Sequence, residues 1–271
     1  MVQMTHLGGP TVLLELGGWR ILTDPTFDPP GRRYRFGWGT SSTKTAGPAL
    51  EPEAIGPIDV LLLSHDHHAD NLDQRGRDLL PAVGTVFTTR AGARRLAAAN
   101  VVGLRAGATR TLQSPGKERL AIRATPCRHG PPFSRPVAGS VIGFALRLGD
   151  GPAVSVWMTG DTVLHRPVRR LAGRLHVDVL LVHLGSVRFP HTGRLRYSMD
   201  GRDATRLLRL LRPRIAVPVH YDGWTHFTEP AAQLRSTLDR ADPTIARLVT
   251  WLQPGMPTDL RPHSTPAHEL P

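Results

Sequence analysis

The segment from Asp59 to Asn71 constrains the fold of this chain more than any other stretch. Its apolar run, Val60 to Leu63, is typical of a buried strand and is too short for a helix core. The run ends in a cluster of histidines and aspartates, and a buried strand rarely passes straight into such residues unless its end presents a site. In an extended chain alternate side chains share a face, so His65 and His67 point the same way. Two imidazoles placed in this way can bind one metal ion, and Asp70 can add an oxygen ligand.

Four other apolar runs also end in a potential metal ligand. Taken singly these residues are ordinary, because aspartate is common in the turn after a strand and a lone histidine is more often a surface or core residue. Taken together with the first cluster they indicate a shared site, since strand ends can meet along one edge of a sheet. The runs and their following residues are Trp19–Thr23 with Asp24, Arg119–Thr125 with His129, Val154–Met158 with Asp161, and Ile215–Val219 with His220.

The chain of 271 residues has one cysteine, Cys127. A single cysteine excludes an internal disulfide and a cysteine-based zinc finger, so a metal site has to rest on histidine, aspartate and glutamate. Neutral imidazoles combined with carboxylates suit Zn, Fe or Mn, and zinc is the commonest of these. We therefore expect Zn as the cofactor, with Mn or Fe as alternatives.

The formal charge of +12 raises the question of an anionic partner. The excess is almost all arginine, since Lys44 and Lys117 are the only lysines, and the arginines are scattered instead of forming one basic block. No nucleic-acid-binding module or aromatic stacking motif accompanies them. We therefore expect a solvated basic surface and a small-molecule substrate, anionic if the charge has a role, and not nucleic acid. The Arg32–Phe36 stretch either grips phosphate or carboxylate or lies in a solvated loop.

The N-terminal residues lack the basic-then-apolar pattern of a secretory signal, and no apolar run approaches the length of a membrane span. We therefore expect a cytoplasmic protein without a membrane span. The oligomeric state is left open.

The pattern of apolar runs and turn residues predicts one domain over residues 1–252 and a Pro-rich C-terminal tail over residues 253–271. Two apolar runs on either side of Gly17-Gly18 predict a β-hairpin near the start of the domain. The stretch Pro25–Pro57 predicts a long ordered loop, which in compact domains is often functional. A last strand is predicted at Leu248–Leu252.

Together these motifs resemble the metallo-β-lactamase superfamily. The resemblance rests on the metal-ligand series above, on the opening HLGGPTVLLELGGWRILTDPTF, on TGDT at residues 159–162 and on PVHYD at residues 218–222. It covers roughly residues 5 to 252 and is most similar to the branch of ascorbate-phosphate lactonases and N-acylphosphatidylethanolamine phospholipase D. It implies an α/β fold, a four-layer αββα sandwich of two mixed β-sheets flanked by helices, with a site for one or two metal ions at the edge between the sheets.

The resemblance also implies a ligand set. Asp24 resembles a family position near the metal histidines, where it would orient one of them from behind. In the implied set His65, His67 and His129 hold the first ion, Asp70 and His220 hold the second, and Asp161 bridges the two.

The chain departs from the family pattern inside its first cluster. The usual pattern is His-x-His-x-Asp-His, and read without a gap this chain places Ala69 and Asp70 where Asp and His are expected. With one inserted residue Asp70 recovers its role and Asn71 replaces the histidine. In both registers Asp70 stays a candidate ligand and one ligand of the second ion is weakened or lost. An inward turn of His68 would compensate for that loss.

The site predicts a metal-dependent hydrolase that acts on an ester, lactone, amide or phosphodiester of a small molecule through a metal-activated water. Asp70 would orient the nucleophile and accept its proton. His183 ends another apolar run and is either a general acid or oxyanion donor, or a hydrogen-bonded structural histidine. The alternatives are a nuclease-like phosphodiesterase, a non-hydrolytic iron redox protein of the same fold, and a degenerate binding protein.

Overall fold

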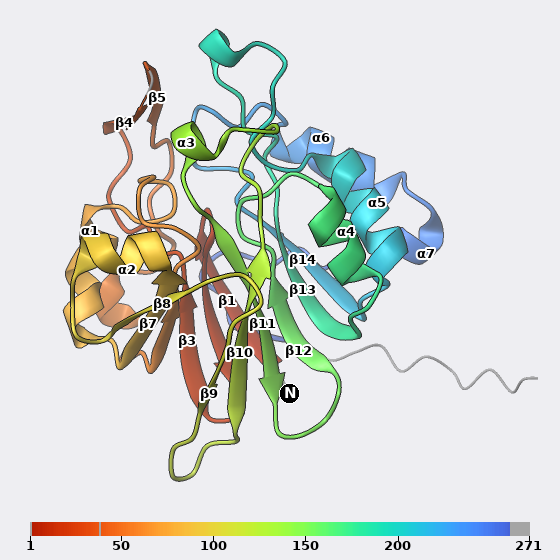
Figure 1. Cartoon of the computed structure of the whole chain (residues 1–271). Helices are drawn as coiled ribbons and strands as arrows, with labels where there is room; N and C mark the ends of the chain where they lie inside the picture. Colours follow the sequence, from red (N-terminus) through yellow and green to blue (C-terminus); the bar gives the residue numbers. More distant parts are fainter. Residues whose placement is uncertain (1, 38, 261–271) are drawn as a thin grey trace, which may run out of the picture.

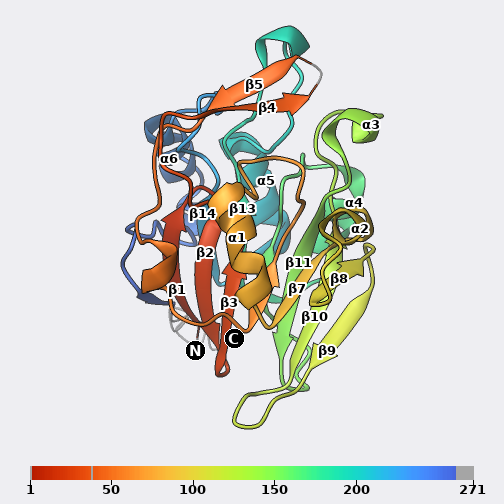
Figure 2. The ribbon, with the colours of Figure 1, turned by 90° about the vertical axis from the view of Figure 1, so that its left-hand side faces the viewer.

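A computed structural model describes residues 2–37 and 39–260 of the chain. Within these residues two mixed β-sheets pack face to face, and helices cover the outer face of each sheet (Figure 1). Figure 2 shows the red strands β1 to β3 and the green strands β10 and β11 in separate layers. This is a four-layer αββα arrangement, so the predicted fold class is confirmed.

The first sheet contains seven strands among the described residues, in the spatial order β15-β1-β2-β3-β6-β7-β8. Strands β1 to β3 are antiparallel, and β3, β6, β7 and β8 are parallel to one another. The predicted hairpin is present between β2 and β3, where Gly17 and Gly18 both have positive φ as a tight hairpin turn requires. The strands are β1 (Val2–Gly8), β2 (Thr11–Leu16), β3 (Trp19–Thr23), β6 (Val60–Leu62), β7 (Thr85–Thr89), β8 (Val101–Leu104) and β15 (Thr258–Leu260).

The second sheet contains six strands among the described residues, in the order β14-β13-β12-β11-β10-β9. Strands β9 to β12 are antiparallel, and β12, β13 and β14 are parallel. They are β9 (Thr109–Leu112), β10 (Leu120–Pro126), β11 (Ile142–Leu148), β12 (Val154–Met158), β13 (Val177–His183) and β14 (Ile215–Val219).

The strand β6 shows why the parallel strands read as continuous apolar runs in the sequence. Val60 and Leu62 belong to the core between the two sheets. Leu61 and Leu63 belong to the core between the first sheet and its outer covering. Because both faces of such a strand are covered, alternation with polar residues is absent, as is usual for parallel sheets.

Helices α1 and α2 lie outside the first sheet, and α4 to α7 lie outside β13 and β14 of the second sheet (Figure 1). The longest of them, α5, is capped by Asp200, whose side chain accepts a hydrogen bond from the backbone N of Asp203 at 2.8 Å. No helix in the described ranges is long and apolar enough to cross a membrane. The helices are α1 (Gln74–Leu79), α2 (Arg90–Leu96), α3 (Arg135–Ala138), α4 (Arg166–Ala172), α5 (Gly201–Leu211), α6 (Ala231–Asp239), α7 (Pro243–Ala246), and the 3₁₀ turns η1 (Pro52–Ala54), η2 (Leu80–Ala82) and η3 (Pro190–Thr192).

The stretch Pro25–Pro57, predicted as a long loop, contains a hairpin of β4 (Arg33–Gly37) and β5 (Thr40–Thr43). This hairpin and α3 rise beyond the same edge of the sandwich (Figures 1 and 2). The hairpin and α3 therefore lie at the same edge as the strand ends that carry the predicted ligands.

The C-terminal part of the described chain differs from the sequence prediction. The predicted strand at Leu248–Leu252 is wrong, because this segment makes only an isolated bridge between Ala216 and Val249. The strand β15 instead lies beyond the predicted boundary at residue 252, and its Leu260 pairs with Val2 of β1. An edge strand such as β1 offers unpaired backbone groups, and β15 satisfies them. Residues 261–271 of the predicted tail lie outside the described residues.

Candidate metal centre

The predicted ligands come together at one edge of the sandwich. His65 follows β6, His129 follows β10, Asp161 follows β12 and His220 follows β14. The carboxyl ends of β6, β12 and β14 point to this edge because each is part of a parallel set. Residues that are far apart in sequence therefore meet there, as expected for a ligand site at strand ends.

Seven side chains at this edge, named here the donor cluster, supply metal-binding atoms to three overlapping groups. Within each group the nitrogen or carboxylate oxygen atoms all lie within 4.8 Å of one another. All but one of the seven residues are buried, and His67 is partly buried. The groups are His65, His67 and His68; His65, His129 and Asp161; and Asp70, Asp161 and His220.

Two histidines of the donor cluster are oriented by backbone carbonyls. His67 donates from Nε2 to the oxygen of Ala138 at 2.8 Å, and His129 donates from Nδ1 to the oxygen of Tyr197 at 2.7 Å. A carbonyl only accepts, so these contacts fix which ring nitrogen carries the proton. In His67 the other nitrogen, Nδ1, is buried and has no hydrogen-bond partner among the described residues. This pattern is the usual one for metal-binding histidines, whose second nitrogen is held by the protein.

The carboxylates of the cluster face histidines without forming well-oriented hydrogen bonds. His220 Nδ1 lies 2.8 Å from Asp161 Oδ1, and His220 Nε2 lies 3.4 Å from Asp70 Oδ2. Both Asp161 oxygens, both His220 nitrogens and Oδ1 of Asp70 nevertheless count as buried atoms without a hydrogen-bond partner in the described part of the chain. Leaving so many buried polar atoms unpaired is costly, whereas a metal ion would satisfy them together.

Burial and neighbouring charges shift the pKa values of several side chains in the donor cluster. Burial and then the neighbouring imidazoles hold the pKa of His65 and His68 well below the usual value, so both rings are neutral at pH 7. Burial alone would raise the pKa of Asp161, but the charge of His220 holds it well below its usual range. Burial lowers the pKa of His220, but the carboxylates of Asp161 and Asp70 outweigh this effect and raise it to about 10. Binding a metal through His220 therefore requires the release of its proton.

The fold shows where the side chains lie in the segment that departs from the family pattern. Asp70 lies in the donor cluster, whereas Asn71 turns away and donates from Nδ2 to Asp24 Oδ2 at 3.2 Å. His68 turns inward, and its Nδ1 lies 3.1 Å from Nε2 of His65. The structure thus places Asp70 and His68 among the candidate metal-binding atoms and Asn71 outside them.

His226 is a further histidine at this site that the sequence interpretation did not include among the ligands. Its side chain is 2% exposed, and its Nε2 lies 3.2 Å from Asp70 Oδ2. Its ring packs against Phe36 at 5.3 Å and Phe227 at 4.5 Å between ring centroids. The only signal in the sequence is a histidine in an aromatic segment, which is too general to assign a ligand.

His183 and Asp24 lie behind the donor cluster and not within its groups. His183 is fully buried, and its Nε2 lies 3.5 Å from Asp24 Oδ2. Asp24 accepts a hydrogen bond from the backbone N of Ser64 at 2.6 Å and so holds the start of the histidine loop. Burial raises the pKa of Asp24 despite the nearby imidazole of His183 and the hydrogen bond from Ser64.

The hairpin β4–β5 contributes an aromatic residue to the site, and its arginines follow the solvated-loop alternative that the sequence left open. Phe36 is 8% exposed in an otherwise open strand, and its ring lies 5.2 Å from that of His68. Arg33 instead donates a hydrogen bond to the Ser41 hydroxyl across the hairpin, and the Arg32 guanidinium lies over the ring of Tyr34. Side chains alternate between the faces of a strand, so the hairpin turns Phe36 toward the histidines and Arg33 and Arg35 away from them.

Comparison with known proteins identifies a family and a set of structural relatives. The family model described as "Beta-lactamase superfamily domain" matches residues 19–221. A protein of Carboxydothermus hydrogenoformans described as a metal-dependent hydrolase is 28% identical over 232 residues, which cover 82% of this chain and 86% of the relative.

Two solved structures share the fold over nearly the whole chain. A possible metal-dependent hydrolase from Veillonella parvula has a TM-score of 0.79 and 20% identity, and the match covers 96% of this chain and all of that one. The isothiocyanate hydrolase from Delia radicum gut bacteria has a TM-score of 0.78 and 18% identity, with 95% and 99% of the two chains covered. At this level of identity the likeness shows the fold alone.

Proposed function

The chain belongs to the beta-lactamase superfamily, and from that premise we propose that this metal-dependent hydrolase holds two metal ions in its donor cluster. The observation that carries the proposal is the convergence of buried, unpartnered donor atoms from separate strand ends. Such ions, when bound, lower the pKa of a coordinated water and stabilise developing negative charge. Four or more donors around each position fit Zn, and Mn or Fe are the alternatives.

We assign the first ion to His65, His67 and His129, with Asp161 between the two ions. Nδ1 of His67 is the donor, because its Nε2 is occupied by a carbonyl. For His129 the same argument assigns Nε2. The protein thus positions each ring before a metal arrives, which reduces the ordering cost of binding.

For the second ion we propose Asp70 and His220 together with a replacement for the histidine missing at Asn71. His226 is the replacement favoured by geometry, since its Nε2 faces Asp70 and has no well-oriented hydrogen bond within the described residues. His68 fits the first ion instead, because its Nδ1 faces His65. Asp70 would also orient the nucleophile, and its buried carboxylate stays ionised because contacts with His220 and His226 hold its pKa well below the usual value against the effect of burial.

The general-acid role of His183 stays a prediction. Its contact with Asp24 favours a positioning role, since Asp24 in turn holds the backbone of Ser64 beside His65. A hydrolytic substrate with an ester, lactone, amide or phosphodiester bond is proposed from the resemblance to the branch of ascorbate-phosphate lactonases and N-acylphosphatidylethanolamine phospholipase D. The isothiocyanate hydrolase among the structural relatives adds isothiocyanates to the compounds worth testing.

Metal analysis of protein purified without added metal tests the proposed function. We expect about two ions of zinc per chain, by the count of donors, and turnover of at least one compound in a panel of esters, lactones, phosphodiesters and isothiocyanates. Turnover should stop on chelation and return with the metal. Iron with visible absorbance and no hydrolysis would favour a redox protein, and protein without metal that binds a ligand would favour a binding protein.

Replacement of His226 by alanine is expected to weaken binding of the second ion at least about tenfold, because it removes a nitrogen donor next to Asp70. Binding of the first ion should change little. Competition with a chromophoric chelator, together with Co²⁺ absorption spectra, measures the two affinities separately. His176→Ala changes an exposed histidine and serves as the control. Unchanged two-ion binding in His226→Ala would remove His226 from the ligand set.

A further inference from the structure

A cavity of about 660 Å³ opens beside the donor cluster. His129 is part of its wall, and so are Gly139 and Ser140, which follow α3. The wall packs directly on a second ligand, since a Cβ added to Gly139 would lie 2.2 Å from Nε2 of His67. A molecule in this cavity would therefore lie against His129, with Gly139 between it and His67.

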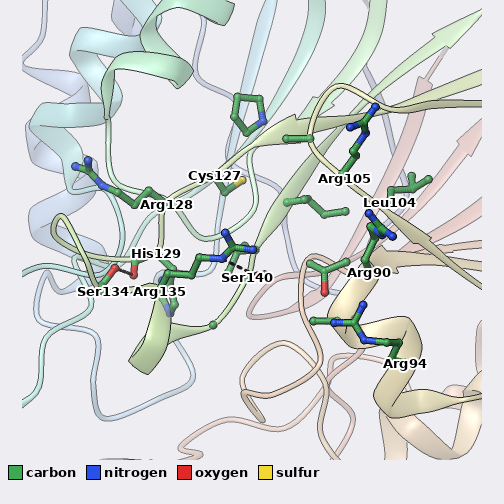
Figure 3. Close-up of a pocket in the computed structure, with 17 residues that line it drawn as sticks. Arg90, Arg94, Leu104, Arg105, Cys127, Arg128, His129, Ser134, Arg135 and Ser140 are labelled. Atoms are coloured by element: carbon green, nitrogen blue, oxygen red, sulfur yellow. Dashed lines mark hydrogen bonds between the residues drawn. The ribbon is translucent and has the colours of Figure 1, made fainter.

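Arginines from three separate segments surround the cavity. Arg90 and Arg94 lie on α2, four residues apart and so on one face of the helix. Arg105 follows β8, and Arg135 begins α3. Figure 3 shows Arg135 extending from one side of the pocket toward Arg90 and Arg94 on the other. Arg128 also contributes to the wall, but its guanidinium extends away from this group in the same view.

These four arginines have no carboxylate partner among the described residues, and no aspartate or glutamate lines the cavity. Arg95 on the same helix differs, because it bonds to Asp66 and is neutralised there. Arg135 uses only Nε, toward Ser140 at 3.1 Å, which fixes the side chain and leaves the end of its guanidinium for a ligand.

A second arginine-lined cavity shows that this arrangement is not simply a result of the arginine-rich composition. It is lined by Arg169, Arg206 and Arg209, but Asp203 is also part of its wall and pairs with Arg206 at 3.1 Å. The cavity beside the donor cluster has no such counter-charge. Unpaired guanidinium groups around one space repel one another, and an anion relieves that repulsion while taking their forked hydrogen bonds.

We propose that this cavity binds the anionic part of the substrate, a small molecule with two or more negative charges on phosphate or carboxylate groups. The proposal rests on the proposed function, since it places the bond to be cleaved at the donor cluster. The volume is in the range of small-molecule sites. Leu104, Ala106 and Ile142 add apolar surface for the uncharged part of the molecule.

Anion binding to the full chain as purified tests the proposal. The probes are phenyl phosphate and isophthalate, which distinguish phosphate from carboxylate, and the variants are Arg94→Gln/Arg135→Gln and the control Arg169→Gln/Arg209→Gln. Calorimetric titration should show that the Kd of at least one probe rises at least about tenfold in Arg94→Gln/Arg135→Gln, because each substitution removes a charge-assisted contact with the anion. The control should change it less than about twofold, as expected for exposed charges outside the site. Metal content should be that of the unmodified protein in both variants.

Three results would overturn the proposal. They are equal weakening in both variants, an unchanged Kd in the first variant, and tighter binding of an oligothymidylate through the same arginines. Repeating the titration after chelation separates this proposal from the proposed function. Arginine-dependent binding that persists in a protein without hydrolytic activity would support the anion site alone. Hydrolysis with two bound ions but no arginine-dependent binding would leave the function intact and reject the anion site.

Discussion

Replacement of His67 by alanine is expected to remove the first metal ion and to abolish turnover. Nδ1 of His67 is a buried donor without a partner in the described chain, and the carbonyl of Ala138 already holds its other nitrogen. Removing the ring takes that nitrogen away from the group it forms with His65 and His68. Loss of a direct ligand should weaken metal binding by more than the roughly 10- to 100-fold seen when only an outer hydrogen-bond partner is lost. Metal content by mass spectrometry and turnover on any substrate found in the panel measure the effect.

His129→Ala is the companion variant and should behave in the same way, because His129 is oriented by Tyr197 as His67 is by Ala138. His176→Ala again serves as a control, since His176 is exposed. Unfolding curves of the metal-free proteins separate loss of metal from loss of fold. Full metal content and full activity in either ligand variant would refute the assignment of the first site.

Replacement of Lys44 by alanine is expected to lower the free energy of unfolding by about 3–5 kcal/mol, the range measured when one partner of a buried ion pair is removed. The Lys44 ammonium lies 2.9 Å from Asp73 Oδ2, and the two side chains are 4% and 0% exposed. Asp73 also caps α1 by accepting a hydrogen bond from the backbone N of Gly76. The pair thus joins the end of β5 to the segment that follows the histidine loop. Urea denaturation of the metal-free protein measures the change.

Lys117 provides a matched control for Lys44 because these are the only two lysines of the chain. Lys117 pairs with Asp59 at 2.5 Å, but the two side chains are 23% and 30% exposed. Lys117→Ala should therefore cost no more than about 1 kcal/mol, as surface ion pairs do. Equal losses in the two variants would show that burial does not set the contribution of the Lys44 pair. Asp73→Asn keeps a capping side chain and would then test the charge separately.

Much of the fold could be predicted because its signals are local. The runs at Val60–Leu63 and Val179–Val182 are apolar throughout because both faces of their strands are covered. The hairpin between β2 and β3 was signalled by its two glycines. The strand β15 was missed because three residues at the edge of a sheet carry almost no pattern of their own, and their pairing depends on β1.

At the metal site, too, some residues could be predicted from the sequence and others could not. Asp161 and His220 lie within three residues of the ends of apolar strands, so their meeting at one edge follows from the strand pattern and the family resemblance. The position of His226 beside Asp70 depends on how a loop returns over the site, and no local pattern encodes it. The same holds for Phe36, whose direction is set by the pairing of β4 with β5.

The sequence by itself determined a candidate metal centre built from His65, His67 and residues at other strand ends, because ligand chemistry and strand periodicity are properties of short segments. Only the tertiary structure decided that Asn71 faces Asp24, that His68 and His226 face the ligands, and that unpaired arginines gather beside them. Those relations depend on long-range packing, which brings together side chains that no sequence spacing connects.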